Sequence, residues 1–382
     1  MIIRTIGLAS ALALAGCATT ATSPLESRGV VSTQNTIAIF APQEQTQSGT
    51  QINYQAWSEV LRSVVFYMGP SLRAKAVRPT PTTGSRVVYG HDSAFRLEGN
   101  RVRFSVLNNE MKEALSEYRS DLERVGNEID ITKLNRNEQL AYWINLHNVI
   151  VIDQIAANYP VTKPSRIVFG EARTPLEDAK LVRLKGVNLS LRDIREEIVF
   201  RHWSDPKIMY GFYRGEIGGP SIQGIAFTSE NVSTLLDSSA REFVNSLRGI
   251  DAVNGELRIS RIYHEARPFF FPSWPDDLKA HLLTYADDDV REEIASPGPI
   301  TEQYYETDIA DLAGGDTRKG PISPVTDALN GGPLEFGLPP QVQRLMREYD
   351  QKMDTLRAQG KLRGRVIIID EPTEDDRGSE VD

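Results

Sequence analysis

Three polar residues with chemical potential lie inside an otherwise apolar stretch of the chain: Asn145, His147 and Asn148. A histidine held by amides can exchange a proton near neutral pH or bind a polar group of a ligand. The same residues can instead satisfy one another within a core, because an unpaired buried polar group costs about 1–3 kcal/mol. We take all three as candidate binding residues, and His147 also as a candidate base.

A second set of candidates lies around a glycine-rich loop, residues 215–221, which reads Gly-Glu-Ile-Gly-Gly-Pro-Ser. Glu216 is a candidate binding carboxylate, although a solvated loop acid gives the same pattern. Ser221 is a candidate nucleophile with His264 as an alternative base, but Ser221 lacks the Gly-x-Ser-x-Gly setting of a nucleophile elbow. The loop can hold an anion through its backbone amides, yet it has no phosphate-loop lysine.

Metal and cofactor chemistry find no support in the sequence. The chain has five histidines and no His-Glu-x-x-His motif, and His202 and His264 do not form a metal-binding spacing. We therefore expect no metal site and no cofactor.

The only cysteine, Cys17, follows a leader that contains Arg4 and an apolar run from Thr5 to Ala15. The sequence Leu-Ala-Gly-Cys at its end resembles a bacterial lipoprotein signal, which predicts that residues 1–16 are a signal peptide and that Cys17 is acylated, for example with palmitate. A plain cleaved signal peptide or a buried N-terminal helix are the alternatives. Acylation would leave the mature protein without a thiol.

This leader predicts an anchored protein of the cell envelope. The apolar run is shorter than the about 20 residues that a membrane-spanning helix requires, so the partner we expect is the lipid bilayer, through acylated Cys17. Ala18 rather than Asp follows the cysteine, which favours the outer membrane, facing the periplasm. The net charge of −9 is diffuse, which argues against a nucleic-acid partner.

The elements that must position these residues follow from hydrophobic periodicity and turn chemistry. Nearly all-round apolarity from Leu140 to Ile155 predicts a buried helix. Asn254-Gly255 predicts a tight hairpin turn. The remaining predicted elements are an amphipathic helix with its apolar stripe from Leu107 to Leu122, two short strands at Leu181–Leu184 and Val187–Leu191, a strand at Lys207–Tyr213, a helix at Ser229–Leu247 capped by Ser229, and a solvated helix at 341–359.

The stretch Glu138–Asn148, which reads Glu-Gln-Leu-Ala-Tyr-Trp-Ile-Asn-Leu-His-Asn, resembles the signature of the family called domain of unknown function 547, with His147 in place of the family's tyrosine. The resemblance covers about Gln51 to Ala286. It implies a compact helix-plus-sheet domain of unsettled activity, and some members are similar to papain- or transglutaminase-type folds. Many members carry Cys-x-x-x-Ser-Cys-Pro, where this chain has Arg214 and Gly219 at the cysteine positions. The resemblance therefore brings no thiol chemistry to this chain.

We expect an α+β protein: a helix-rich single domain packed on a small mixed or antiparallel sheet. The predicted parts are a signal peptide (1–16), a flexible tether (17–50), the DUF547-like domain (51–286), a poorly patterned extension with a helix at 341–359 (287–370), and a disordered acidic tail (371–382).

Two functions from different classes fit this organisation. The first is an envelope lipoprotein that binds an envelope protein or a small ligand, without catalysis, in a groove beside Asn145, His147 and the 215–221 loop. The alternative is a hydrolase in which His147 or His264 assists a nucleophile other than cysteine, such as Ser221.

Overall fold

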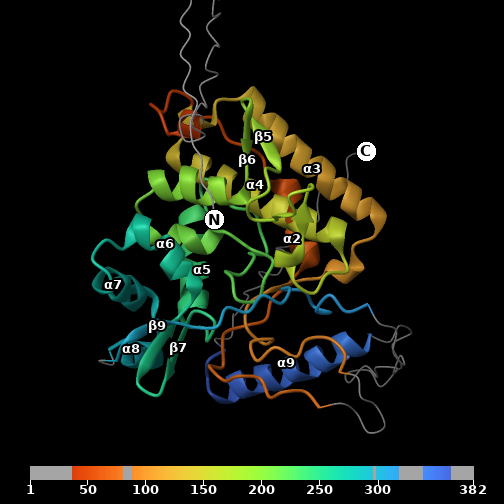
Figure 1. Ribbon diagram of the computed structural model, residues 1–382, viewed down its shortest axis with the longest axis vertical. Helices are drawn as coiled ribbons and strands as arrows, with labels where there is room; N and C mark the ends of the chain where they lie inside the picture. Colours follow the sequence, from red (N-terminus) through yellow and green to blue (C-terminus); the bar gives the residue numbers. More distant parts are fainter. Residues whose placement is uncertain (1–36, 81–87, 296–297, 318–338, 363–382) are drawn as a thin grey trace, which may run out of the picture.

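The computed structural model describes residues 37–80, 88–295, 298–317 and 339–362 (Figure 1). The predicted signal peptide, Cys17, most of the tether and the acidic tail lie outside these ranges. No helix among the described residues is long and apolar enough to cross a membrane.

The centre of the fold is helix α4 (Arg136–Asn158), which is buried along most of its length, as predicted. The side chain of Asn135 begins the helix by accepting hydrogen bonds from the backbone N–H groups of Asn137 and Glu138. Its apolar residues face in every direction because other elements cover it on several sides. These are α3 (Asn109–Glu128), α5 (Val232–Val244), the short helix η3 (Ile131–Lys133) and the π-helix η5 (Asp193–Phe200).

The remaining helices lie outside this centre. They are α2 (Gln55–Val64), α6 (Arg261–Phe270), α7 (Asp276–Tyr285), α8 (Asp288–Ala295), α9 (Pro340–Ala358) and the 3₁₀ helices η1 (Ala38–Phe40), η2 (Phe104–Val106), η4 (Pro164–Arg166) and η6 (Pro206–Gly211). Of these, α7, α8 and α9 lie below the centre in Figure 1.

The strands are short and form small sheets at the edges of the helical layers. The antiparallel pairs are β1 (Val65–Phe66) with β2 (Arg101–Val102), β3 (Val168–Phe169) with β4 (Thr174–Pro175), β5 (Val182–Leu184) with β6 (Val187–Leu189), and β7 (Ile250–Val253) with β8 (Glu256–Ile259). Strand β9 (Ile300–Glu302) adds parallel to β8. Asn254 and Gly255 both have positive φ, as the predicted hairpin turn requires. The fold class is therefore α+β, as predicted.

Two sequence predictions are wrong in detail. The predicted strand Lys207–Tyr213 is largely the 3₁₀ helix η6, because Asp205 caps the N–H of Lys207 and Pro206 occupies the first helical position. The helix predicted to begin at Ser229 begins at Val232, and Ser229 does not cap it.

Segments from both ends of the chain pack on the central domain. Phe40, in the predicted tether, is 4% exposed and packs edge-on against Trp143, with ring centroids 5.4 Å apart. The predicted solvated helix is present as α9, but it buries one face. In Figure 1, α9 lies at the bottom beside loops between β1 and β2, and the Lys352 Nζ donates to the carbonyls of Met68 and Leu97 there.

Candidate functional site

The two signature asparagines serve as backbone clamps. Asn145 donates through Nδ2 to the carbonyl of Phe227 (2.7 Å) and accepts from its N–H (3.1 Å). Asn148 donates to the carbonyl of Gly211 (2.9 Å) and accepts from the N–H of Tyr213 (2.9 Å). Each amide therefore pairs with an irregular segment much as a strand would, and both side chains are buried.

His147 is 0% exposed and lies in the same layer. Its Nδ1 is 3.2 Å from the Asn148 Oδ1, and its Nε2 is 3.5 Å from Nη1 of Arg195. Because a guanidinium can only donate, Nε2 acts as the acceptor, and the proton is assigned to Nδ1. Burial, reinforced by the charge of Arg195, lowers the pKa of His147 to about 3. The imidazole is therefore neutral at physiological pH and sealed from solvent.

A surface cleft opens close to these clamps, and we call it the signature cleft. It holds about 520 Å³ and lies between the start of α2 and the segment before α5. Its lining is mostly amide, hydroxyl and charged: Gln51, Ile52, Asn53, Tyr54, Gln55, Ser58, Arg62, Glu138, Thr228, Ser229 and Glu230.

Side chains at the start of α4 hold both walls of the signature cleft. Glu138 is buried and its Oε1 accepts from the N–H of Ile52 (3.1 Å), which fixes the α2 side. Asn137 donates to the carbonyl of Ser229 (3.3 Å), which fixes the opposite wall. Gln51 and Glu230 bridge the two walls through a hydrogen bond of 3.1 Å. The polar residues of the signature helix thus shape this cleft from beneath.

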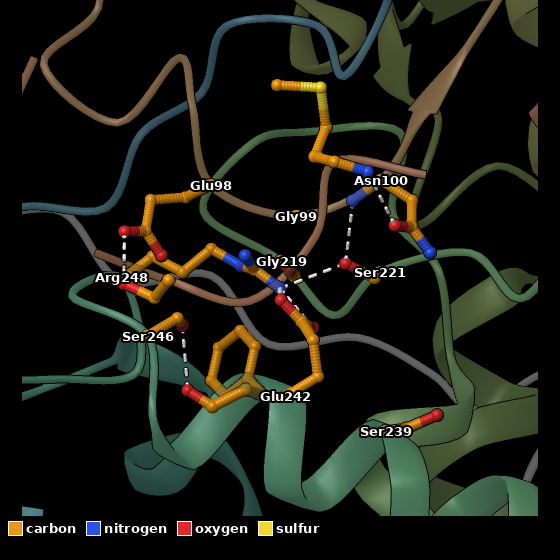
Figure 2. Close-up of polar contacts among 12 residues, drawn as sticks. Glu98, Gly99, Asn100, Gly219, Ser221, Ser239, Glu242, Ser246 and Arg248 are labelled. Carbon is orange, nitrogen blue, oxygen red and sulfur yellow. Dashed lines mark hydrogen bonds and ion pairs between the residues drawn. The ribbon is translucent and has the colours of Figure 1, made fainter. Parts of the chain in front are cut away.

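Ser221 lies elsewhere, among backbone and guanidinium donors. Figure 2 shows its hydroxyl oxygen accepting from the N–H of Asn100 and from Nη2 of Arg248, both at 3.0 Å. No hydrogen bond joins Ser221 to an imidazole among the residues that the structure describes. A serine nucleophile needs a base that accepts its proton, and these neighbours are donors.

Arg248 anchors this region. Its Nη2 bonds both carboxylate oxygens of Glu242 (2.5 and 2.7 Å), and its Nε donates to the carbonyl of Gly219 (3.2 Å) (Figure 2). Gly99 has a positive φ of 68°, and a Cβ there would lie 2.6 Å from Nη1 of Arg248, so only glycine fits.

These residues surround a crevice that we call the loop pocket, which is too narrow to admit a water molecule. It is lined by Gly99, Asn100, Arg101, Tyr213, Glu216, Ile217, Gly219, Pro220, Ser221, Arg248 and Ala310. Four buried polar atoms of these lining residues have no hydrogen-bond partner within the described ranges: Nε of Arg101, Oη of Tyr213, Oε1 of Glu216 and Nη1 of Arg248.

Glu216 is 6% exposed, so it is not the solvated loop acid that one interpretation of the sequence allowed. Burial raises its pKa to about 7, the nearby Glu177 adds to the rise, and Arg214 and Arg261 oppose it. The carboxyl is therefore poised between its charged and neutral forms near neutral pH.

The residues at the family's two cysteine positions have structural contacts here. Arg214 is buried and forms an ion pair of 2.5 Å with Glu265, and a Cβ on Gly219 would approach Oη of Tyr305 to 3.1 Å. His264, the alternative base, lies half-buried on α6 against the ring of Trp274, and its Nε2 has no partner among the described residues.

The described residues include no group of three or more His, Cys, Asp or Glu side chains placed to hold a metal ion. Sequence reasoning missed Arg101, Tyr213 and Arg248 as site residues. The sequence offers no signal for Arg101, because the run Arg-Val-Arg-Phe alternates regularly and gives Arg101 and Arg103 the same pattern.

Comparison with known proteins assigns the central part of the chain to a family. A family model described as "Protein of unknown function, DUF547" matches residues 131–244, which include α4, the glycine-rich loop and α5. The chain therefore contains a DUF547 domain, as the signature predicts. No curated protein and no solved structure matches the chain.

Proposed function

We propose that this DUF547-containing chain is a lipid-anchored protein of the cell envelope that binds a ligand in the signature cleft without catalysing a reaction on it. The anchor rests on the leader and on Cys17 as the only cysteine of the chain. The binding role rests on the cleft, whose volume of about 520 Å³ falls within the usual range for small-ligand sites, about 300–1,000 Å³.

The observation that carries the binding role is the use of the signature residues. Asn137, Glu138 and Asn145 position the walls of the cleft through backbone contacts, so they act on a ligand indirectly. The cleft's amides, hydroxyls and mixed charges suit a polar ligand that exchanges hydrogen bonds with water for hydrogen bonds with the protein.

The absence of catalysis is proposed because the candidate nucleophile and bases do not form a unit. His147 is neutral and enclosed, and Ser221 accepts hydrogen bonds from an amide and a guanidinium. His264 belongs to neither arrangement. A catalytic pair would need hydrogen-bond reach between nucleophile and base.

The binding half of the proposal can be tested with a bulky substitution at the rim of the cleft. Gln55 is exposed and lines the cleft, and its Nε2 donates to Oε1 of Glu59, one turn along the same helix. Gln55→Trp should fill the cleft without disturbing the core, and Glu110→Trp, on the exposed start of α3, is the matched control. Ligand-observed NMR with a library of polar fragments should give hits for the wild type and Glu110→Trp that Gln55→Trp loses. Hits that survive in Gln55→Trp, or no hits at all, would contradict binding in this cleft.

The anchor can be tested separately. Cys17→Ser should move the protein from the membrane fraction to the soluble fraction, and mass spectrometry of the wild type should find an acylated N-terminal cysteine. An unprocessed N-terminus would contradict the anchor and leave the binding test unaffected.

A further inference from the structure

We infer that the loop pocket is a second binding site, separate from the signature cleft, that takes a compact anion of the carboxylate type between Arg101 and Arg248. The two sites share no lining residue. The inference therefore goes beyond the proposed function and can fail without it.

Unpartnered donors at the loop pocket are the first argument. Nε of Arg101, Nη1 of Arg248 and Oη of Tyr213 belong to side chains that are at most 3% exposed, and each donor is buried without a partner among the described residues. Buried donors are almost always satisfied in folded proteins. Three unsatisfied donors on residues that line one crevice indicate a site for an acceptor.

Charge is the second argument. Arg101 is 0% exposed, and none of its hydrogen bonds within the described ranges reaches a carboxylate. They go to the backbone carbonyls of Phe95, Arg96, Glu98, Gly99 and Asn100. Arg248, by contrast, is paired with Glu242 through a single nitrogen. Glu98 and Asp311 lie near enough to stabilise the charge of Arg101, but neither carboxyl group bonds it directly, so its guanidinium can still pair with a bound anion.

The shape of the crevice limits the size of that anion. The loop pocket is narrower than a water molecule as it stands, so an occupant must part the glycine-rich loop. That loop is held by the 305–310 segment, because Gly218 donates to the carbonyl of Glu306 (2.8 Å) and Ala310 donates to that of Gly215 (2.7 Å). Each arginine has one free nitrogen, Nε of Arg101 and Nη1 of Arg248, and the two oxygens of a small carboxylate can accept from one donor each.

Glu216 couples this site to pH. It borders the loop pocket and is faced by Glu177, Arg214, Arg261, Tyr213, Tyr305 and Ser165. A charged Glu216 repels an incoming anion, whereas a protonated Glu216 can donate a hydrogen bond to it. Anion affinity should therefore rise as the pH falls through about 7, the range in which Glu216 takes up its proton.

The test uses formate and acetate as probes, titrated at constant ionic strength against the mature protein, with thermal shift and calorimetry as readouts. Tyr213→Phe removes one unpartnered donor and nothing else, and it should weaken binding by roughly 3- to 10-fold. Tyr142→Phe is the matched control, because its hydroxyl donates to the carbonyl of Leu122 on the α3 side of α4. Equal binding by wild type and Tyr213→Phe, or no binding of either probe, would overturn the inference.

A second variant keeps the test decisive if Tyr213→Phe folds poorly. Glu216→Gln should bind the probes at pH 8 as tightly as the wild type does at pH 6, with little dependence on pH. A wild-type affinity that does not change between these values would also overturn the inference. A peptide with a free C-terminal carboxylate is tested as a third probe. Binding of the peptide would indicate that the site takes the end of a larger ligand, whereas binding of formate alone would indicate a free small acid.

Discussion

Asn145, His147 and Asn148 on the signature helix differ from the residues of the loop pocket in how their buried polar groups are paired. On α4, both polar ends of Asn145 and of Asn148 have backbone partners, and both ring nitrogens of His147 face a polar neighbour. Two other atoms of the same helix, Oε1 of Gln139 and Nε1 of Trp143, have no partner in the described chain. At the loop pocket, Arg101, Tyr213, Glu216 and Arg248 each keep one buried atom without a partner in the described chain.

The hydrogen-bond partners distinguish these two groups of residues more clearly than their residue types do. A histidine between two asparagines suggests chemistry in the sequence, yet its contacts are those of a core residue. The arginines and the tyrosine of the loop pocket are unremarkable in the sequence, but their unmet hydrogen-bonding capacity is costly unless something binds there. The walls of the signature cleft are held in place by hydrogen-bonded side chains of α4.

The largest effect on this comparison is expected from Asn145→Ala. The substitution removes two hydrogen bonds and leaves the N–H and C=O of Phe227 unpaired in a buried setting. We expect the free energy of unfolding to fall by about 4 kcal/mol, measured by urea denaturation. Asn109→Ala, at an exposed position on α3, should change it by less than about 0.5 kcal/mol. Equal effects of the two variants would show that the hydrogen bonds between Asn145 and Phe227 do not stabilise the fold.

A smaller effect, on the pH dependence of the free energy of unfolding, is expected from Glu216→Gln. The folded-state pKa of Glu216 is raised from 4.5 to about 7, so the folded protein holds this proton more tightly than the unfolded chain does. Its contribution to stability is present below about pH 4.5 and is lost as the pH rises through about 7. The wild type should lose about 2 kcal/mol between pH 5 and 8 that Glu216→Gln retains. Parallel stability profiles for the two proteins would show that Glu216 is not buried as described.

The smallest effect is expected from Ser221→Ala. The N–H of Asn100 loses its acceptor, whereas Arg248 keeps Glu242, so the free energy of unfolding should fall by about 1 kcal/mol. A fluorophosphonate probe should label the wild type no more than it labels Ser221→Ala. Labelling confined to the wild type would show that Ser221 is a reactive nucleophile and would support the alternative function, a hydrolase.

Much of the fold could be predicted where one physical rule dominates. The continuous apolar run predicts that α4 is buried, and Asn254-Gly255 predicts the hairpin of β7 and β8. The prediction failed at Lys207–Tyr213, where an apolar run indicates a strand but Asp205-Pro206 provides a helix start. Local turn chemistry overrode the pattern there.

The site was harder to predict because it depends on tertiary partners. Asn145, His147 and Asn148 were identified as polar residues in an apolar helix, but only the positions of Phe227, Gly211 and Arg195 show how their hydrogen bonds are used. Arg101 and Arg248 come from distant segments, and no spacing in the sequence links them.

The protonation state of His147 tests the central claim, that the signature polar residues build the fold and do no chemistry, most directly. NMR of the imidazole between pH 5 and 8 should show a neutral ring with its proton on Nδ1 and no titration, because burial and Arg195 hold its pKa near 3. A ring that titrates between pH 6 and 7 would contradict the account, since it would place an accessible base at the centre of the signature.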